Sequence, residues 1–260
     1  MYLLDPAQVS LIAFDLDDTL TESKSPITDQ TAQALTRLMG LRPVAIISGG
    51  RFQQFEQQVL RLLPPTAPLD SLHLMPTCGT RYLRYTDGVW HELYKHDLTA
   101  DERDRAVASL TRRAKELGAW EPDEKVTGER IEDRGSQITY SALGQLAKPA
   151  DKRAWDPTGV RRLTLRDAVA LDVPDLSVGA GGATSIDVTR RGVDKAYGMQ
   201  QLSELTAIPL SAMLYVGDQT GPGGNDYPVV EIGVPTIAVA SWCETLDVID
   251  NICQQLEEAT

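Results

Sequence analysis

The sequence predicts an α/β fold in which a Rossmann-like parallel-sheet core carries an inserted α+β cap domain. Two short apolar runs near the N-terminus, residues 9–14 and 43–47, are each followed by a polar loop and an amphipathic helix. Such runs are typical of strands buried on both faces, and successive strand–loop–helix units build a right-handed parallel layer. The same pattern returns near the C-terminus, after a middle region of different character.

Each element of the N-terminal part follows from local pattern. A helix is expected over 28–39, because Thr28 can cap it and the apolar residues of this segment fall on one face. The second strand leads into Ser48-Gly49-Gly50-Arg51 and then into a Gln-rich helix that we expect to end near Leu62. These segments form the first two units of the predicted sheet.

The middle of the chain alternates short strands with charged helices, which is an α+β pattern. Expected there are strands on both sides of the Asp87-Gly88 turn within 81–94, a helix over 101–117, a strand within 137–143 and a helix over 158–171. The α/β pattern resumes with a helix over 194–205 and strands at 213–216 and 234–239. We therefore predict a core of residues 1–86 and 187–260 and a cap of residues 87–186.

Composition excludes several classes of protein. A net charge of −12 over 260 residues argues against a nucleic-acid-binding surface. No apolar stretch approaches the roughly 18 residues that a membrane-spanning helix needs. The three cysteines, Cys78, Cys243 and Cys253, have no metal-ligand spacing, and an odd number is typical of reduced thiols. We expect a soluble, cytoplasmic protein that binds neither nucleic acid nor membrane.

Acidic residues gather where strands are expected to end. Asp15 and Asp17 follow the first strand, and Asp218 and Asp226 follow the strand at 213–216. Ligands of open α/β sheets bind beyond the carboxyl ends of the strands, and carboxylate oxygens suit octahedral Mg²⁺. Two carboxylates two residues apart can also divide the chemistry, one attacking phosphorus to form an aspartyl-phosphate and the other protonating the leaving oxygen. An Asp-rich turn without chemical role is the alternative, and its recurrence at Gly217-Asp218 argues against it.

Three further residues could supply the positive potential that a phosphate needs. Ser48 and the backbone N–H groups of Gly49 and Gly50 could hold phosphoryl oxygens. Lys195 could neutralise the carboxylates and the incoming phosphate. Taken singly, a Ser-Gly-Gly loop is usually a turn and a lone lysine is usually solvated. Their order relative to the acidic motifs favours a phosphoryl-transfer site.

With these residues in this order, the chain resembles the haloacid dehalogenase-like (HAD) superfamily. The four matching motifs are Asp15-x-Asp17-x-Thr19, Ser48, Lys195, and Gly217-Asp218 through Asn225-Asp226. The inserted domain is similar to the cap of the type IIB branch, and within that branch the chain resembles the eukaryotic-type phosphomannomutases over most of its length. The segments that carry this likeness are Ile131-Glu-x-Arg134 with Tyr140-Ser-x-Leu-Gly144, Gly181 to Lys195, and Gly217 to Tyr227.

The resemblance implies roles for individual residues. It implies Asp15 as nucleophile, Asp17 as general acid/base, and Mg²⁺ bound by Asp15, the Asp17 backbone carbonyl and Asp218, with Asp226 supporting them. The other implied residues are Ser185 and Asp187 on sugar hydroxyls and Arg134 and Arg153 on the distal phosphate of the substrate. The substrate would then be a small phosphorylated sugar, and the resemblance suggests a homodimer through the cap.

The departures from the family concern the distal phosphate. Two positions that hold arginine in the family hold Lys24 and Gln145 here, and neither can replace a bidentate guanidinium. The loop Ser48–Arg51 resembles sugar phosphatases of the broader branch. A mutase must bind a bisphosphorylated sugar in two orientations, whereas a phosphatase binds one phosphate.

These departures place hydrolysis first. We expect a Mg²⁺-dependent phosphohydrolase that acts on a hexose phosphate through an aspartyl-phosphate. A phosphomannomutase that interconverts mannose 6-phosphate and mannose 1-phosphate is the alternative. A non-catalytic sugar-phosphate-binding protein is the third possibility, because fold does not fix function.

Overall fold

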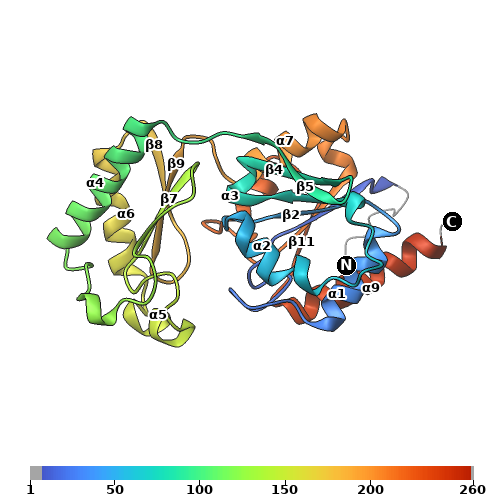
Figure 1. Cartoon of the computed structure of the whole chain (residues 1–260), viewed down its shortest axis with the longest axis horizontal. Helices are drawn as coiled ribbons and strands as arrows, with labels where there is room; N and C mark the ends of the chain where they lie inside the picture. The colour runs from blue at the N-terminus through green and yellow to red at the C-terminus, as the bar shows by residue number, and fades with distance from the viewer. Residues whose placement is uncertain (1–7, 259–260) are drawn as a thin grey trace. The chain divides into compact units, whose positions relative to one another are not determined.

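The computed structural model describes residues 8–258 of the chain. They form two compact units, which we call the core, made of the chain up to Lys95 and from Asp194 onward, and the cap, His96–Val193. In Figure 1 the blue and red ends of the chain both belong to the core, and the green and yellow middle forms the cap. None of the helices among the described residues is long and apolar enough to cross a membrane.

The compact unit His96–Val193 differs at both edges from the expected cap of residues 87–186. Asp87 and Gly88 adopt positive φ angles of 52° and 83° and close a hairpin, so the chain returns beside the preceding strand and stays in the core sheet. At the other edge, the strand of residues 185–190 pairs on both sides with cap strands. The sequence predicted the turn at Asp87-Gly88 correctly, but it did not show that the strand after the turn belongs to the core sheet.

The core is built on a mixed sheet in the order β11-β10-β1-β2-β3-β4-β5. Its parallel strands are β1 (Leu11–Phe14), β2 (Val44–Ile47), β3 (Leu72–Met75), β10 (Met213–Gly217) and β11 (Thr236–Ala238). The hairpin β4 (Arg81–Thr86) and β5 (Val89–Lys95) extends it antiparallel. β1, β2, β3 and β10 are buried throughout, as the apolar runs of β1, β2 and β10 predict.

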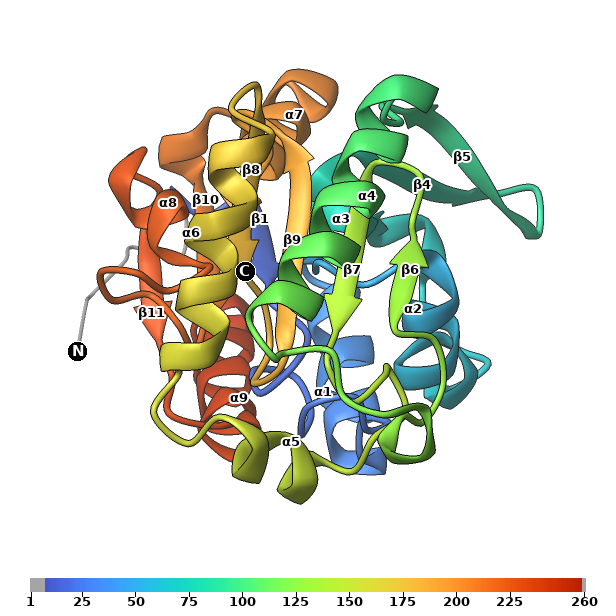
Figure 2. The ribbon, with the colours of Figure 1, turned by 90° about the vertical axis from the view of Figure 1, so that its left-hand side faces the viewer.

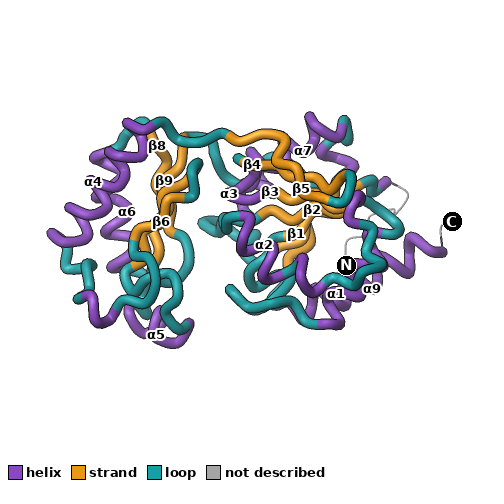
Figure 3. The backbone as a smooth tube through the Cα atoms, in the orientation of Figure 1, coloured by secondary structure: helices purple, strands orange, loops and turns teal. Residues whose placement is uncertain are grey.

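Helices cover both faces of the core sheet (Figure 3). One face packs against α1 (Asp29–Met39), α2 (Phe52–Gln58) and α9 (Trp242–Glu258). The other packs against α7 (Lys195–Thr206) and α8 (Tyr227–Glu231). The remaining short segments of the core are α3 (Pro76–Gly79) and the 3₁₀ turns Leu60–Leu62, Leu69–Ser71 and Leu210–Ala212.

The cap has an antiparallel sheet in the order β6-β7-β9-β8, with helices on one face. Its strands are β6 (Ile131–Asp133), β7 (Gln137–Ser141), β8 (Leu176–Ala180) and β9 (Ser185–Arg190). Its helices are α4 (Ala100–Glu116), α5 (Pro149–Trp155) and α6 (Val160–Asp172), with a 3₁₀ turn at Asp123–Lys125. Figure 2 shows α4 and α6 side by side over the strands, and their shared apolar core includes Ile138, Tyr140 and Val188.

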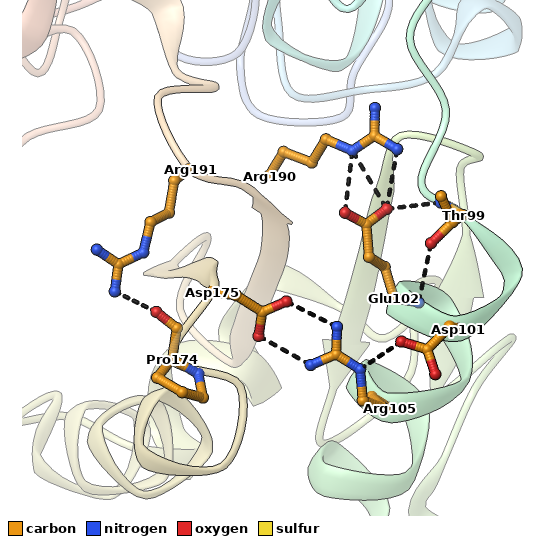
Figure 4. Close-up of polar contacts among 8 residues, drawn as sticks. All are labelled: Thr99, Asp101, Glu102, Arg105, Pro174, Asp175, Arg190 and Arg191. Carbon is orange, nitrogen blue, oxygen red and sulfur yellow. Dashed lines mark hydrogen bonds and ion pairs between the residues drawn. The ribbon is translucent and has the colours of Figure 1, made fainter.

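Ion pairs join the start of α4 to Asp175, just before β8, and to Arg190, the last residue of β9 (Figure 4). Thr99 caps α4 in a capping box with Glu102, whose carboxylate also accepts from Arg190 at the end of β9, with Nη2–Oε2 at 2.9 Å. Arg105 makes a two-pronged pair with Asp175, at 2.7 and 2.8 Å. The polar contacts at this end of the cap therefore lie on its surface and join elements that are distant in sequence.

The predicted fold class is confirmed: a parallel-rich α/β sheet carries a separate α+β unit. The helix expected from Thr28 starts as predicted, with the Thr28 side chain accepting from the Thr31 N–H. The sequence analysis did not predict β3, β6, β8, α5, α8 and α9. Most of these segments are short, and they lack the clear capping residues and turn signals that mark the predicted elements.

Candidate active site

The ends of three neighbouring core strands bring the predicted acidic and phosphate-binding segments together. In the parallel register, Phe14 of β1 lies beside Val216 of β10 on one side and Ile46 of β2 on the other. Asp15 and Asp218 therefore leave adjacent strands at the same edge of the sheet, and the Asp15 N–H donates to the Val216 carbonyl at 3.0 Å. Ser48 follows β2 at this edge. The strand-end argument made from the sequence holds for these three residues.

Asp15, Lys195 and Asp226 form a buried charged cluster at this edge. The Lys195 Nζ lies 2.6 Å from a carboxylate oxygen of Asp15 and 2.6 Å from one of Asp226. The exposed fractions of these residues are 4%, 1% and 0%. One ammonium thus faces two carboxyl groups in a place that is almost closed to water.

The cluster shifts the pKa values of its members. Burial raises the pKa of Asp15 to about 8; the Lys195 ammonium opposes this rise and the Asp226 carboxylate adds to it. Burial disfavours the charge of Lys195, but Asp15 and Asp226 outweigh burial and raise the pKa of its ammonium. Burial also raises the pKa of Asp218, with Asp226 contributing. Carboxyl groups shifted in this direction would be stabilised in their ionised form by a further cation.

Close packing of α7 places Lys195 in the cluster. Asp194 caps the helix by accepting from the Tyr197 N–H at 3.0 Å, so Lys195 is its first residue. One turn on, Gly198 meets Gly79: a Cβ built on Gly79 would lie 2.4 Å from the Gly198 Cα. Only glycines allow this approach, which brings the start of α7 to the edge of the sheet where Asp15 lies.

Three carboxylates of the core could hold a metal ion. Asp15, Asp218 and Asp226 each offer an oxygen, and these oxygens lie within 4.8 Å of one another. Asp226 also accepts from Lys195, from the Tyr215 hydroxyl at 2.5 Å and from the Gln219 N–H at 2.9 Å, which fixes the orientation of its carboxylate. An all-oxygen donor set of this kind fits a hard divalent cation.

The loop after β2 has the features of a phosphate-binding turn. The Ser48 hydroxyl is buried and accepts from the Gly50 N–H at 3.1 Å, while its carbonyl accepts from the Cys78 N–H. A Cβ on Gly49 would meet only the Cys78 Sγ, at 3.9 Å, so the backbone of Gly49 is lightly covered on that side. The hydroxyl and these N–H groups lie at the same edge of the sheet as Asp15.

The Asp17 carboxylate lies outside the buried cluster and is held by amide donors. It accepts from the Lys24 N–H at 2.6 Å, from Gln54 Nε2 at 2.8 Å and from Gln58 Nε2 at 3.3 Å. Lys24 itself is exposed and has a positive φ of 57°. The sequence analysis assigned Lys24 to the distal phosphate and gave the glutamines no role. In the structure, the contact of Lys24 with Asp17 is made through its backbone.

In the cap, one face of the sheet is polar. Successive side chains of a strand point to opposite faces of the sheet. Those of Ile138, Tyr140, Ile186 and Val188 face the helices, so those of their sequence neighbours face the opposite side. In register across this face lie Glu132 of β6, Thr139 of β7 and Asp187 of β9, and the Thr139 hydroxyl donates to Asp187 at 2.7 Å. Ser185 lies on the same face, opposite Ser141. Hydroxyl and carboxylate groups of this kind can bind sugar hydroxyls.

The expected cap cations differ in their surroundings. Arg134 is paired with Glu132, its Nη2 lying 2.6 Å from Oε2. Arg153 lies on the exposed side of α5, whereas its neighbour Lys152 is buried and donates to the Gln145 carbonyl at 3.0 Å. The sequence analysis named Arg153 and overlooked Lys152. The signal was the helical phase of α5, which was not predicted as a helix.

In comparisons with known proteins, the matching family model and the similar sequences are all phosphomannomutases. The model of a family described as eukaryotic phosphomannomutase matches residues 128–255. A phosphomannomutase of Spinacia oleracea is 25% identical over 230 residues, which are 86% of each chain. Those of Galdieria sulphuraria and Saccharomyces cerevisiae are 26% and 23% identical, over 84–85% of each chain.

Solved structures show the same fold. An IMP-nucleotidase of Plasmodium falciparum superposes with a TM-score of 0.71 at 16% identity, covering 95% of this chain and 71% of that one. A trehalose-6-phosphate phosphatase related protein gives 0.58 at 14% identity and covers 96% and 100%. A haloacid dehalogenase-like hydrolase of Bacteroides thetaiotaomicron gives 0.59 at 15% identity and covers 94% and 99%.

Fold, site and comparisons together identify a phosphoryl-transfer enzyme with the fold of the haloacid dehalogenase-like superfamily. Within that superfamily, the chain resembles the phosphomannomutases, and the resemblance extends through the cap. The family likeness predicted from the four motifs is thereby confirmed.

Proposed function

We propose that this protein is a Mg²⁺-dependent sugar-phosphate mutase of the phosphomannomutase type, working through an aspartyl-phosphate at Asp15. The buried Asp15 carboxylate against Lys195, beside Asp218 and Asp226, is the observation that carries phosphoryl transfer. The likeness to phosphomannomutases, which spans core and cap alike, favours isomerisation as the outcome. Hydrolysis, the first expectation from the sequence, becomes the second candidate.

The first half-reaction uses groups of the core. An Asp15 oxygen forms a bond to phosphorus while the bond from phosphorus to the sugar oxygen breaks, and Asp17 gives its proton to that oxygen. Lys195 and the N–H groups after Ser48 stabilise the charge on the phosphoryl oxygens. Bound Mg²⁺, held by Asp15 and Asp218 with Asp226 behind them, would supply the remaining neutralisation.

The second half-reaction decides between the two candidates. In a mutase, another hydroxyl of the phosphorylated sugar attacks the aspartyl-phosphate and Asp17 accepts its proton. In a phosphatase, water takes the place of that hydroxyl. Ser185 and Asp187 on the polar face of the cap sheet are suited to bind sugar hydroxyls, which supports a sugar phosphate as the substrate of either candidate.

The charges of the cap favour the second candidate, a hexose-phosphate phosphatase. Arg134 is already neutralised by Glu132, and Gln145 is uncharged where an arginine was expected. Asp187 adds a negative charge to the same sheet face. A distal phosphate would therefore meet less positive charge on the cap than a bisphosphate-binding mutase needs, and the buried Lys152 is engaged with the Gln145 carbonyl.

Phosphorus NMR of one reaction separates the two functions. Mannose 1-phosphate is incubated with the enzyme and Mg²⁺, with and without glucose 1,6-bisphosphate. A mutase yields mannose 6-phosphate and depends on the bisphosphate, whereas release of inorganic phosphate alone would establish the phosphatase. If both product signals stay absent across a panel of hexose phosphates, the proposed function is wrong.

The same assay tests the nucleophile and the metal. Asp15→Asn should lower turnover by at least about 10³-fold, because an amide cannot form the aspartyl-phosphate. Asp18→Asn is the matched control: Asp18 is exposed, and asparagine tolerates its positive φ of 64°. Chelation should abolish turnover and added Mg²⁺ restore it. Activity that survives chelation would contradict the role given to the carboxylate cluster.

A further inference from the structure

We propose that Gln54 positions the general acid/base Asp17 by holding one oxygen of its carboxylate. The proposal rests on the function proposed above, in which Asp17 exchanges a proton with the sugar oxygen. It concerns a residue for which neither the acidic motifs nor the family likeness gave a role. It follows from contacts within the core.

The two oxygens of the Asp17 carboxylate are held from different sides. Oδ1 accepts from the Lys24 N–H at 2.6 Å and from Gln58 Nε2 at 3.3 Å. Oδ2 accepts from Gln54 Nε2 at 2.8 Å. Gln54 therefore fixes Oδ2, and loss of this donor would leave the carboxylate held through Oδ1 alone, with a wider range of rotation about its Cβ–Cγ bond.

Helical spacing explains why these two glutamines, out of four in α2, reach Asp17. Gln54 and Gln58 are four residues apart and lie on one face of the helix, where Gln58 is buried and Gln54 half-buried. Gln53 and Gln57 are exposed. Gln58 Nε2 also donates to the Ser25 carbonyl at 2.8 Å, so its amide is divided between Asp17 and the loop, whereas the Gln54 amide donates to Asp17.

The absence of a side chain at Gly50, in the loop after β2, leaves room for the Gln54 amide. A Cβ built on Gly50 would lie 2.1 Å from Gln54 Oε1 and 2.6 Å from its Cδ. Any side chain at position 50 would therefore displace the Gln54 amide. The Gly50 N–H also donates to the Ser48 hydroxyl, so one glycine serves both the loop that faces the phosphate and the path of the side chain that reaches Asp17.

An amide is suited to orient a group that alternates between two protonation states. A protonated carboxyl keeps an acceptor oxygen, so Gln54 can donate to Asp17 before and after the proton moves. A neutral donor also brings no charge that would tie Asp17 into a permanent ion pair. The carboxyl can then keep one orientation toward the sugar oxygen through both half-reactions.

The test compares two substrates that differ in their need for a general acid. Single-turnover rates, with enzyme in excess, isolate formation of the aspartyl-phosphate. Mannose 1-phosphate has a poor leaving group and needs the Asp17 proton, whereas p-nitrophenyl phosphate has a good one and needs it little. Gln54→Met, which keeps the length but removes the donor, should lower the rate with mannose 1-phosphate about 10- to 100-fold. The rate with p-nitrophenyl phosphate should change less than about 3-fold, and substrate affinity should be unaltered.

Controls separate this role from a structural one. Gln53→Met, on the exposed side of α2, should leave both rates unchanged. Equal losses on both substrates, or no loss with Gln54→Met, would overturn the proposal. A wild-type enzyme that turns over neither substrate would overturn the proposed function instead. Thermal unfolding of each variant identifies any that do not fold.

Discussion

The charged cluster at Lys195 in the core and the ion pairs at α4 in the cap differ in their exposure to water. In the core, Lys195 and two carboxylates are almost inaccessible and lie at one edge of the sheet. In the cap, pairs such as Arg113–Asp172 and Glu102–Arg190 lie along the helices with their side chains 15–39% exposed. Both units thus contain hydrogen-bonded charges, but the Lys195 cluster of the core is almost closed to water, whereas these two pairs of the cap are partly exposed.

The difference indicates what each set of charges is for. The free energy lost when charges are removed from water exceeds their mutual attraction, unless the groups are in close contact and every one of them has hydrogen-bond partners. A buried cluster of one ammonium and two carboxylates is therefore unfavourable for stability alone, and it suits a site that binds a cation and a phosphate. The exposed pairs of the cap cost little to desolvate and contribute modestly to packing. Function explains the first arrangement and structure the second.

Replacing Lys195 by methionine breaks the core cluster and should have the largest effect. Methionine fills a similar volume but leaves Asp15 and Asp226 buried without their cation. We expect loss of turnover and a free energy of unfolding of the core lower by about 3–5 kcal/mol. Urea unfolding with hydrogen exchange, followed for β1 and β10 separately from β7 and β9, should confine the loss to the core. Lys125→Met, an exposed lysine with a long contact to Glu121, is the control and should stay within about 0.5 kcal/mol. A comparable loss in both variants would contradict the comparison.

The sequence predicted most of the core site because strand ends and motif order carry it. Asp15, Ser48 and Asp218 follow strands whose apolar runs are unambiguous, and a parallel register brings such ends together. Lys195 was found through its order relative to these motifs. Asp226 was found the same way, but its bonds to Tyr215 and Gln219 depend on packing that no local pattern reveals.

The parts that escaped prediction depend on phase and direction. Gln54 lies in a Gln-rich helix, and in the sequence nothing distinguishes it from Gln53; only the packing against Gly50 and Asp17 does. Lys152 and Arg153 are adjacent, and only the orientation of α5 decides which is buried. The cap boundary was misplaced because the Asp87-Gly88 turn specifies a hairpin but not the sheet to which its second strand belongs.

Asp172→Asn tests whether the ion pairs of the cap contribute to its stability. Asp172, at the end of α6, accepts from both nitrogens of the Arg113 fork at 2.7 and 2.8 Å and from the Ser109 hydroxyl at 2.7 Å. The Arg113 guanidinium holds the pKa of this carboxyl well below its usual range. We expect the variant to lose about 1–2 kcal/mol in the unfolding of the cap, because charged hydrogen bonds are lost where α4 meets α6. Asp167→Asn, whose partner Arg166 is its sequence neighbour on the exposed side, should change stability by less than about 0.5 kcal/mol. Equal effects would mean that the pair to Asp172 is no stronger than an ordinary surface pair.

Glu102→Gln should have the smallest effect, and that effect should depend on pH. Hydrogen bonds from Arg190 and from the Thr99 N–H lower the pKa of Glu102 from 4.5 to about 2 in the folded cap. Because the folded pKa is lower than the unfolded one, the carboxylate stabilises the cap fully above about pH 4.5 and loses this contribution as the pH falls toward 2. The free energy of unfolding of the wild type should therefore exceed that of the variant by about 0.5–1 kcal/mol at neutral pH. The difference is small because the pair is partly exposed. Urea unfolding of both proteins between about pH 6 and pH 2.5 should show this difference shrinking as the pH falls. A difference that stays constant, or that grows toward acid pH, would show that Glu102 acts through the shape of its capping box and not through its charge.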